Sequence, residues 1–236
     1  DYSVDLSGTA AQVAAALSET FAGQYTGKAT ASDTHDTAEL KTISETTTGE
    51  ITLHRYDVAL SGTVAEVKAA LSGTFAAEYT GAVTVSNAPN VADLKAINDA
   101  TSGGITLTTA DGALSGTAAD LVAAFAGTVT QHTGTVEVSD THDISQLKTI
   151  NDNTNGTITL HDYSVDLSGT AAQVAAALSG DFAAQYTGKA TASDTHDISQ
   201  LITINNATTG EITLHSYAVD LSGTAAQVAA ALSGDF

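Results

Sequence analysis

The 236-residue sequence has no cysteine, methionine or tryptophan, a single proline, and only 5% aromatic residues. Without cysteine the chain can form neither a disulfide framework nor a thiolate metal site. No apolar run approaches the ~18 residues of a membrane span, and the N-terminal stretch does not have the pattern of a signal peptide. Because an initiating methionine is also missing, we expect the sequence to be an internal or processed segment of a longer protein.

Basic residues are scarce as well. Lys and Arg number 7 against 27 Asp and Glu, which gives a net charge of −20 at pH 7. Such a surface repels nucleic acid and anionic membranes, so we expect neither as a partner, whereas divalent cations are attracted. Much of the 42% apolar content is alanine, which predicts a thin core of small side chains supplemented by regularly spaced Val, Leu and Ile.

What the sequence has in abundance is repetition. The segment LSGT recurs at Leu6, Leu60, Leu114, Leu167 and Leu221, with spacings of 54, 54, 53 and 54 residues. We therefore expect residues 1–236 to form a single domain of repeated units, with boundaries at 9–62, 63–116, 117–169 and 170–223 and the start of a further unit at 224–236.

Each unit contains two predicted helix starts. The predicted N-caps are residues whose side chains can accept a hydrogen bond from the first helical turn: Thr9, Asp36, Thr63, Asn90, Thr117, Asp143, Thr170, Asp197 and Thr224. Three residues after each stands Gln, Glu or Asp, and one residue further stands Val or Leu. Seven of the nine positions carry the Gln or Glu of a capping box, whereas Asp93 and Asp120 are too short to reach back.

Glycines precede eight predicted strands. They are Gly27, Gly49, Gly81, Gly103, Gly134, Gly156, Gly188 and Gly210. We expect them to supply a turn or helix C-cap with positive φ. Apolar residues follow two and four positions after each glycine, as in Ile51 and Leu53, which predicts a short strand with those side chains facing inward.

Helix, turn, short strand and loop recur about every 27 residues. This pattern predicts an elongated α/β solenoid of about nine coils, with a parallel sheet on one face and short helices on the other. The units resemble tandem repeats of very large secreted bacterial surface proteins, adhesin-like or haemolysin-type and often cyanobacterial, in segments such as LSGTAA, YTG, QLKTIN and TTGEITL. The resemblance is one of repeat style, and it implies an extracellular or cell-surface location. The glycine-rich nonapeptide that binds calcium in many of those proteins is absent.

The SDTHD loops are the best candidates for a cation site. They offer six carboxylates as candidate Ca²⁺ ligands: Asp33, Asp36, Asp140, Asp143, Asp194 and Asp197. In the alternative interpretation, which we favour, the second aspartate of each loop is an N-cap and the first is a solvated turn residue. The corresponding loop of another unit reads SNAPN, with Asn87 and Asn90, which argues against a metal that every repeat needs.

Two other sets of residues invite a functional interpretation. Asp1 with Asp5 and Asp162 with Asp166 are carboxylate pairs that could join neighbouring coils through a cation, although an extended segment with one apolar side explains them more simply. His54, His161 and His215 follow predicted strands, and we interpret them as a surface row because converging zinc ligands would not be separated by whole units.

No nucleophile elbow, phosphate-binding loop or dinucleotide fingerprint occurs. We therefore do not expect an enzyme, and Ca²⁺ is the one candidate cofactor. We expect a structural repeat segment of an extracellular fibre or giant adhesin, whose partners are copies of itself or further repeats of the same kind. The alternative hypothesis is a surface module that binds calcium or cell-surface glycans.

Overall fold

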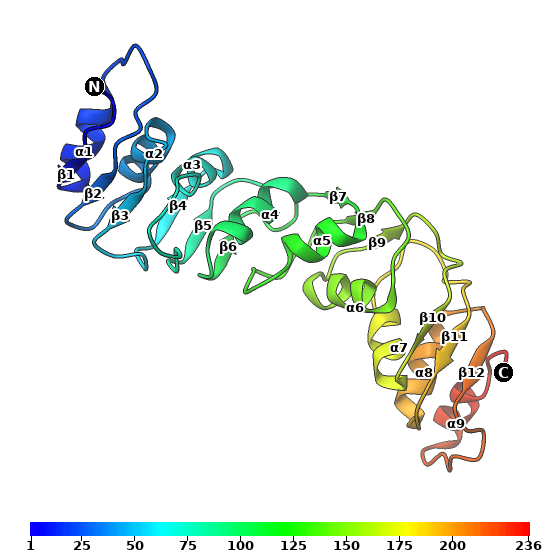
Figure 1. The fold of residues 1–236 in the computed structure, drawn as a ribbon. Coiled ribbons are helices and arrows are strands. Elements are labelled where there is room, and N and C mark those ends of the chain that lie inside the picture. The colour runs from blue at the N-terminus through cyan, green and yellow to red at the C-terminus, as the bar shows by residue number, and fades with distance from the viewer. The chain divides into compact units, whose positions relative to one another are not determined.

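A computed structural model describes all residues, 1–236, and has an α/β fold with nine helices and four three-stranded sheets (Figure 1). The chain divides into two compact units, one formed by Asp1–Ala110 with Ala124–Thr130 and the other by Asp111–Ala123 with Gln131–Phe236. Each unit is described by itself. No helix is both long enough and apolar enough to cross a membrane.

The helices are short, of seven to ten residues. They are α1 (Ala10–Leu17), α2 (Thr37–Thr46), α3 (Val64–Ala70), α4 (Val91–Ala100), α5 (Ala118–Ala124), α6 (Ile144–Asn153), α7 (Ala171–Leu178), α8 (Ile198–Ala207) and α9 (Ala225–Ala231). Each begins at the residue after a predicted N-cap, so all nine helix starts are confirmed. Both hydrogen bonds of the capping box are present in seven helices; α4 has only the bond from Asp93 N to the Asn90 side chain.

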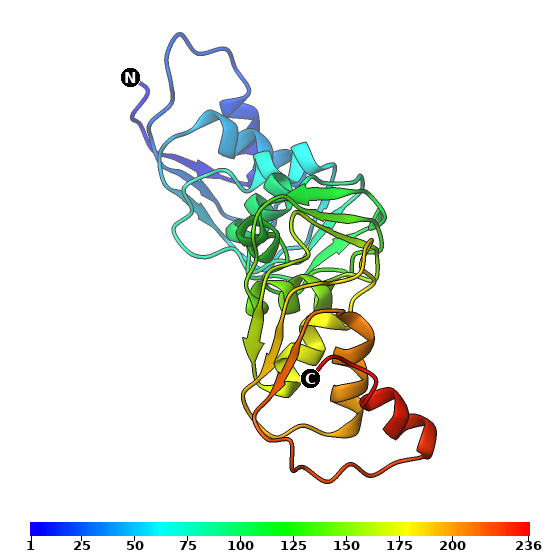
Figure 2. The ribbon, with the colours of Figure 1, turned by 90° about the vertical axis from the view of Figure 1, so that its right-hand side faces the viewer.

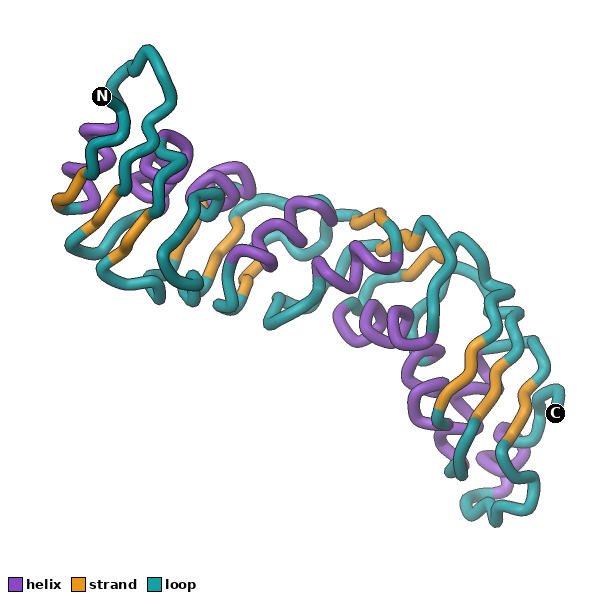
Figure 3. The backbone as a smooth tube through the Cα atoms, viewed as in Figure 1, coloured by secondary structure: helices purple, strands orange, loops and turns teal.

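The strands have three residues each and pair in parallel, as predicted. The sheets are β1 (Leu6–Gly8), β2 (Ala29–Ala31) and β3 (Ile51–Leu53); β4 (Leu60–Gly62), β5 (Val83–Val85) and β6 (Ile105–Leu107); β7 (Leu114–Gly116), β8 (Val136–Val138) and β9 (Ile158–Leu160); and β10 (Leu167–Gly169), β11 (Ala190–Ala192) and β12 (Ile212–Leu214). Figure 3 shows the strands of a sheet side by side in orange. The first strand of each sheet, the LSG segment, was predicted only as extended chain.

The sheets differ from the single continuous sheet that we expected. On the far side of β3 from β2, Ile51 forms one parallel bridge with Phe75, and the backbone there does not continue as a strand. The next ladder starts instead at β4, where Leu60 pairs with Val83. Four residues beyond Phe75, Tyr79 makes a separate bridge with Thr101. Phe75 and Tyr79, which lie between α3 and β5, thus each form a single bridge with a different segment, so this part of the chain does not extend the sheet.

One face of each sheet packs against helices. Helix α1 contacts β1 and β2, α3 contacts β4 and β5, and α7 contacts β10 and β11. Figure 2 shows the last sheet with α7 and α8 on one of its faces. The predicted inward residues form the core: Leu40, Ile43 and Ile51 are completely buried. Helix α9 is an exception, because Val228 is half-buried and Leu232 remains 57% exposed.

The glycines before the strands are required for a different reason from the predicted one. None of them has positive φ, a conformation found only at Gly127. Instead, a Cβ atom on Gly103 would overlap Gly81 O, and one on Gly210 would overlap Gly188 O. These glycines are needed because two backbone segments approach each other closely.

Candidate functional site: acidic loops and buried histidines

The first aspartate of each SDTHD loop caps a helix in the preceding part of the chain. Asp33 Oδ1 accepts a hydrogen bond of 2.7 Å from Ala10 N, the first residue of α1. Asp140 and Asp194 accept bonds of 2.7 Å from the first residues of α5 and α7. Asn87 does the same for α3 at 2.8 Å, with an amide oxygen. These residues join two segments of the same unit that lie 22 or 23 residues apart, and they satisfy helix N–H groups that would otherwise lack a partner.

The second aspartate of each loop is the N-cap of the helix that follows. Asp36 Oδ1 accepts from Glu39 N at 2.8 Å, and Asp143 and Asp197 accept from the equivalent Gln N–H groups at 2.9 and 2.8 Å. Hydrogen bonds from the Ser145 and Ser199 hydroxyls, followed by those from backbone N–H groups, lower the pKa of Asp143 and Asp197. Both carboxylates therefore remain charged at the positive end of a helix dipole.

The structure does not bring the six predicted calcium ligands together. No three or more His, Asp or Glu side chains are arranged to hold a metal ion. Within each loop one carboxylate faces the preceding helix and the other faces its own helix. Calcium prefers six to eight oxygen ligands, so these residues do not fit such a site as they stand. The calcium site stays a prediction for which this geometry offers no support.

The histidine of each SDTHD loop, which the sequence places in the candidate site beside the two aspartates, is buried. His35 is 4% exposed, and its Nε2 lies 2.9 Å from the hydroxyl of Tyr79, a residue 44 positions later. His142 is also 4% exposed, and its Nε2 lies 3.0 Å from the hydroxyl of Tyr186, again 44 positions later. Each pair links the loop before one helix to the segment that follows the next helix.

The tyrosine hydroxyls define the direction of these hydrogen bonds. Tyr79 Oη lies 2.7 Å from Val58 O, and Tyr186 Oη lies 2.6 Å from Val165 O. A carbonyl only accepts, so the hydroxyl donates its single proton to it and accepts from the histidine. The Nε2 atom of each imidazole therefore carries a proton, and the buried Nδ1 atoms of His35 and His142 have no partner.

Burial lowers the pKa of both histidines. For His35 this loss of hydration outweighs the opposing effect of Asp36 and Asp33, and for His142 it outweighs that of Asp162, Asp143 and Asp140. Burial also raises the pKa of Tyr79 and Tyr186 well above the usual range. The pairs are neutral links at pH 7, and their burial leaves no access for a substrate.

At one pair of equivalent positions, in two successive units, neither residue of this pair is present. Position 89, which corresponds to His35, is proline, and position 132, which corresponds to Tyr79, is histidine. The signal that could have revealed the pair in the sequence is this joint change, since each position alone looks like an ordinary loop or turn residue. Spacing within one repeat would not have revealed it because the partners belong to different repeats.

A buried threonine forms a second link of the same kind. Thr47 Oγ1 donates to Gly27 O at 2.8 Å and accepts from Gly49 N at 2.9 Å. Thr208 makes the same two bonds, to Gly188 O and from Gly210 N, both at 2.9 Å. The hydroxyl thus satisfies two backbone groups at the point where a glycine allows neighbouring segments to approach closely.

The remaining predicted residues serve local structure. Asp1 and Asp162 accept hydrogen bonds from the serine two residues later, whereas Asp5 and Asp166 accept from the backbone N–H of Lys28 and Lys189. Neither pair of carboxylates is arranged around a shared cation. The three histidines of the predicted surface row are exposed, as expected: His54, His161 and His215.

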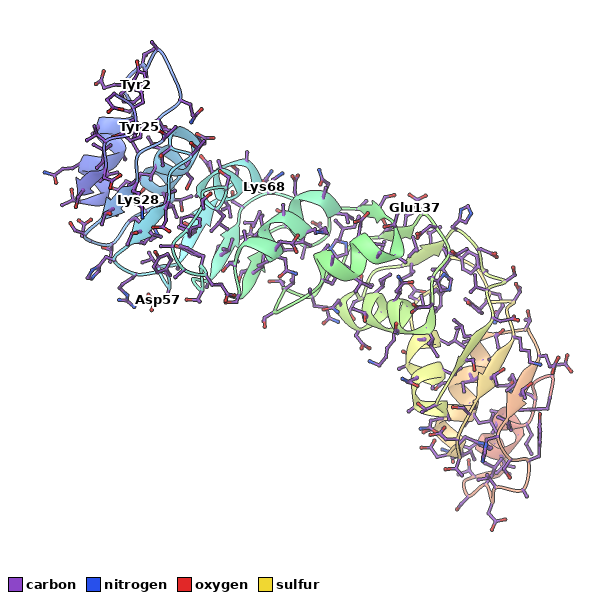
Figure 4. The ribbon with its side chains drawn as sticks, viewed as in Figure 1. Tyr2, Tyr25, Lys28, Asp57, Lys68 and Glu137 are labelled. Carbon is purple, nitrogen blue, oxygen red and sulfur yellow. The ribbon has the colours of Figure 1, made fainter.

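Ion pairs lie on the surface, and one of them, between Lys68 and Asp93, lines an open hollow together with Asn87. Lys28 Nζ lies 3.0 Å from Glu50 Oε1 on the neighbouring segment, and Lys68 on α3 pairs with Asp93 on α4 (Figure 4). Asp57 pairs with Arg55, and Glu137 accepts from the Ser115 hydroxyl at 3.0 Å. Exposed pairs of this type contribute little to stability.

Comparison with known proteins finds no match to this chain among protein-family models, curated proteins or solved structures.

Proposed function

We propose that this chain is a structural repeat segment of an extracellular bacterial fibre or giant adhesin. In this proposal its repeats stack as a solenoid of about nine 27-residue coils, and its partners are further repeats, either in a longer chain or in copies that associate head to tail. The protein is a scaffold and not an enzyme, and it is located at the cell surface.

The observation that carries the proposal is the recurrence of the same hydrogen bonds in every unit. A loop Asp or Asn caps the preceding helix four times, at Asp33, Asn87, Asp140 and Asp194. A buried threonine donates to a glycine carbonyl at Thr47, Thr101 and Thr208, whereas Thr154 donates to His132 O. Because these bonds join segments 20 to 23 residues apart, every added unit brings its own set of them, as in linear repeat proteins.

The side chains that might have carried chemistry are used in these links. The loop aspartates accept from helix N–H groups, and the loop histidines bond to tyrosines. A scaffold needs such uniformity, whereas a binding or catalytic site is usually a local departure from the repeat. The use of the loop aspartates and of the histidine Nε2 atoms in structural bonds supports the scaffold over the calcium- or glycan-binding alternative.

Analytical ultracentrifugation and negative-stain microscopy test this proposal. We expect rods of uniform width whose length grows in steps as protein concentration increases, with the same result in calcium and in EDTA. Single short rods at every concentration would overturn self-association but not the solenoid; compact particles would overturn both. A saturable signal on a glycan array would instead favour the binding module, and a rise in melting temperature that requires calcium would favour a cation site.

A further inference from the structure

We infer that the buried His–Tyr pairs select which repeat can pack on which, so that a repeat with tyrosine at the position of Tyr79 packs correctly only on one with histidine at the position of His35. The inference rests on the proposed stacking of repeats and adds a rule for its order. The partner of a repeat with histidine at the position of His35 is therefore a repeat with tyrosine at the position of Tyr79.

The argument begins with the direction of the hydrogen bonds. His35 Nε2–H donates to Tyr79 Oη, which donates to Val58 O, at 2.9 and 2.7 Å. Three segments of the chain meet in this row, and each of the two protons has one acceptor. His142, Tyr186 and Val165 form the same row at 3.0 and 2.6 Å.

A mismatched partner breaks the row at a buried position. Histidine in place of tyrosine would set two imidazoles against each other, and a ring with no hydroxyl would leave the His35 N–H without an acceptor. Both histidines are 4% exposed, so water cannot replace the lost bond at low cost. Buried polar groups of this kind are known to define the register of packed helices, because the wrong register leaves them unpaired.

The sequence contains a second combination that supports the rule. Where the loop histidine is replaced by Pro89, the position equivalent to the tyrosine holds His132, whereas His35 and His142 are matched by Tyr79 and Tyr186. If each position were free to vary alone, nothing would couple the two changes. The joint change in the sequence is what a pairing rule would produce.

Four proteins test the rule within the first compact unit: the unmodified chain, Tyr79→His, His35→Pro, and the double variant His35→Pro/Tyr79→His. Denaturant unfolding gives the equilibrium constant of each. We expect Tyr79→His to raise the unfolding constant at least tenfold, since it creates the His–His mismatch. The double variant, which reproduces the Pro–His combination, should recover most of that loss.

If the His–Tyr bond has no role in selecting partners, the double variant should not be more stable than Tyr79→His. If the His–Tyr bond only contributed stability, the double variant would be as unstable as Tyr79→His or less stable, and that result would overturn the rule. The His142→Pro/Tyr186→His set repeats the cycle in the second unit, and failure of both double variants to fold would also overturn it. Microscopy of the same variants tests the proposed function independently. If the variants still form rods while the effects of the two substitutions on the unfolding constant are simply additive, the pairing rule is rejected and the proposed function is not.

Discussion

At the scale of single residues, an oxygen atom matters more than its charge in the loops. Asn87 and Asp194 make the same bond to the first N–H of a helix, at 2.8 and 2.7 Å. The loop position therefore needs an acceptor of the right length and does not need a carboxylate.

Replacement of Asp194 separates these two requirements. Asp194→Asn should change the free energy of unfolding by less than about 0.5 kcal/mol, whereas Asp194→Ala should lower it by about 1 kcal/mol because an N–H of α7 loses its cap. Chemical denaturation with and without calcium measures both. A loss with Asn as large as that with Ala, present only in calcium, would show that the carboxylate binds a cation.

The buried histidines make stability depend on pH. Burial lowers the pKa of His35 and His142 in the folded chain, so the unfolded chain binds more protons below its own histidine pKa of about 6.5. The free energy of unfolding is therefore highest above that pH. It should fall as the pH decreases through the window between the unfolded and folded pKa values, by up to ~1.4 kcal/mol per pH unit for each histidine.

Denaturation at pH 7.5, 6.5 and 5.5 checks this slope. The variant His35→Gln/His142→Gln should have a shallower slope than the unmodified chain, and His54→Gln/His161→Gln, which removes two exposed histidines, is the matched control. Equal slopes in the two variants would contradict the assignment of the pH dependence to the buried rings.

At the scale of elements, the close approach of backbone segments is the feature most sensitive to mutation. Gly103 and Gly104 are adjacent, yet only Gly103 faces the carbonyl of Gly81; the nearest atom to a Cβ on Gly104 would be 3.8 Å away. Gly103→Ala should lower the free energy of unfolding by about 1–3 kcal/mol, since the backbone must move to make room.

The neighbouring glycine is a matched control. Gly104→Ala should be neutral or stabilise by about 0.4–1 kcal/mol, because alanine reduces the freedom of the unfolded chain. Thermal unfolding of the two variants side by side measures the difference. Equal effects of the two substitutions would show that close packing against Gly81 is not what requires glycine at position 103.

The elements that could be predicted from sequence are those whose signals are local. Thr9, Gln12 and Val13 lie within five residues, and the hydrogen bonds of the cap connect just these positions, so the helix start is visible in the sequence. The strand at Leu6–Gly8 was not predicted as a strand because Ser7 and Gly8 have little β propensity; its pairing with β2 comes from a partner 23 residues away.

The candidate site was less predictable for the same reason. The role of Asp33 depends on Ala10, and that of His35 depends on Tyr79, both distant in sequence. The sequence marks the glycines before the strands as necessary, but their positions do not tell whether positive φ or close approach of two backbone segments requires them. Similarly, the division into four sheets depends on where Phe75 and Tyr79 find their partners, which no local pattern records.

At the scale of the whole molecule, the dominant property is the net charge of −20. Repulsion among the carboxylates opposes compact structure, and the seven ion pairs use the few lysines and the arginine without offsetting the excess. Salt screens such repulsion over a Debye length of about 10 Å at 0.1 M.

The melting temperature should therefore rise with salt. Between 10 mM and 300 mM NaCl we expect an increase of about 2–4 °C, equivalent to ~1 kcal/mol for a chain of this size. Differential scanning calorimetry measures it, with sucrose at matched osmolality as the uncharged control. A melting temperature that stays level or falls with NaCl would mean that the exposed ion pairs outweigh the repulsion.

Position 87 holds Asn where the equivalent positions of the other units hold Asp, and this difference has a practical consequence for protein engineering. Because Asn87 preserves the bond to Val64 N without a charge, one negative charge can be removed from the loop of one unit and kept in the next. Substitution of Asn for Asp at this position in chosen units would therefore set a pattern of charge along the chain, and adjust solubility or adsorption to a mineral or a polycation while the bond to the helix is kept.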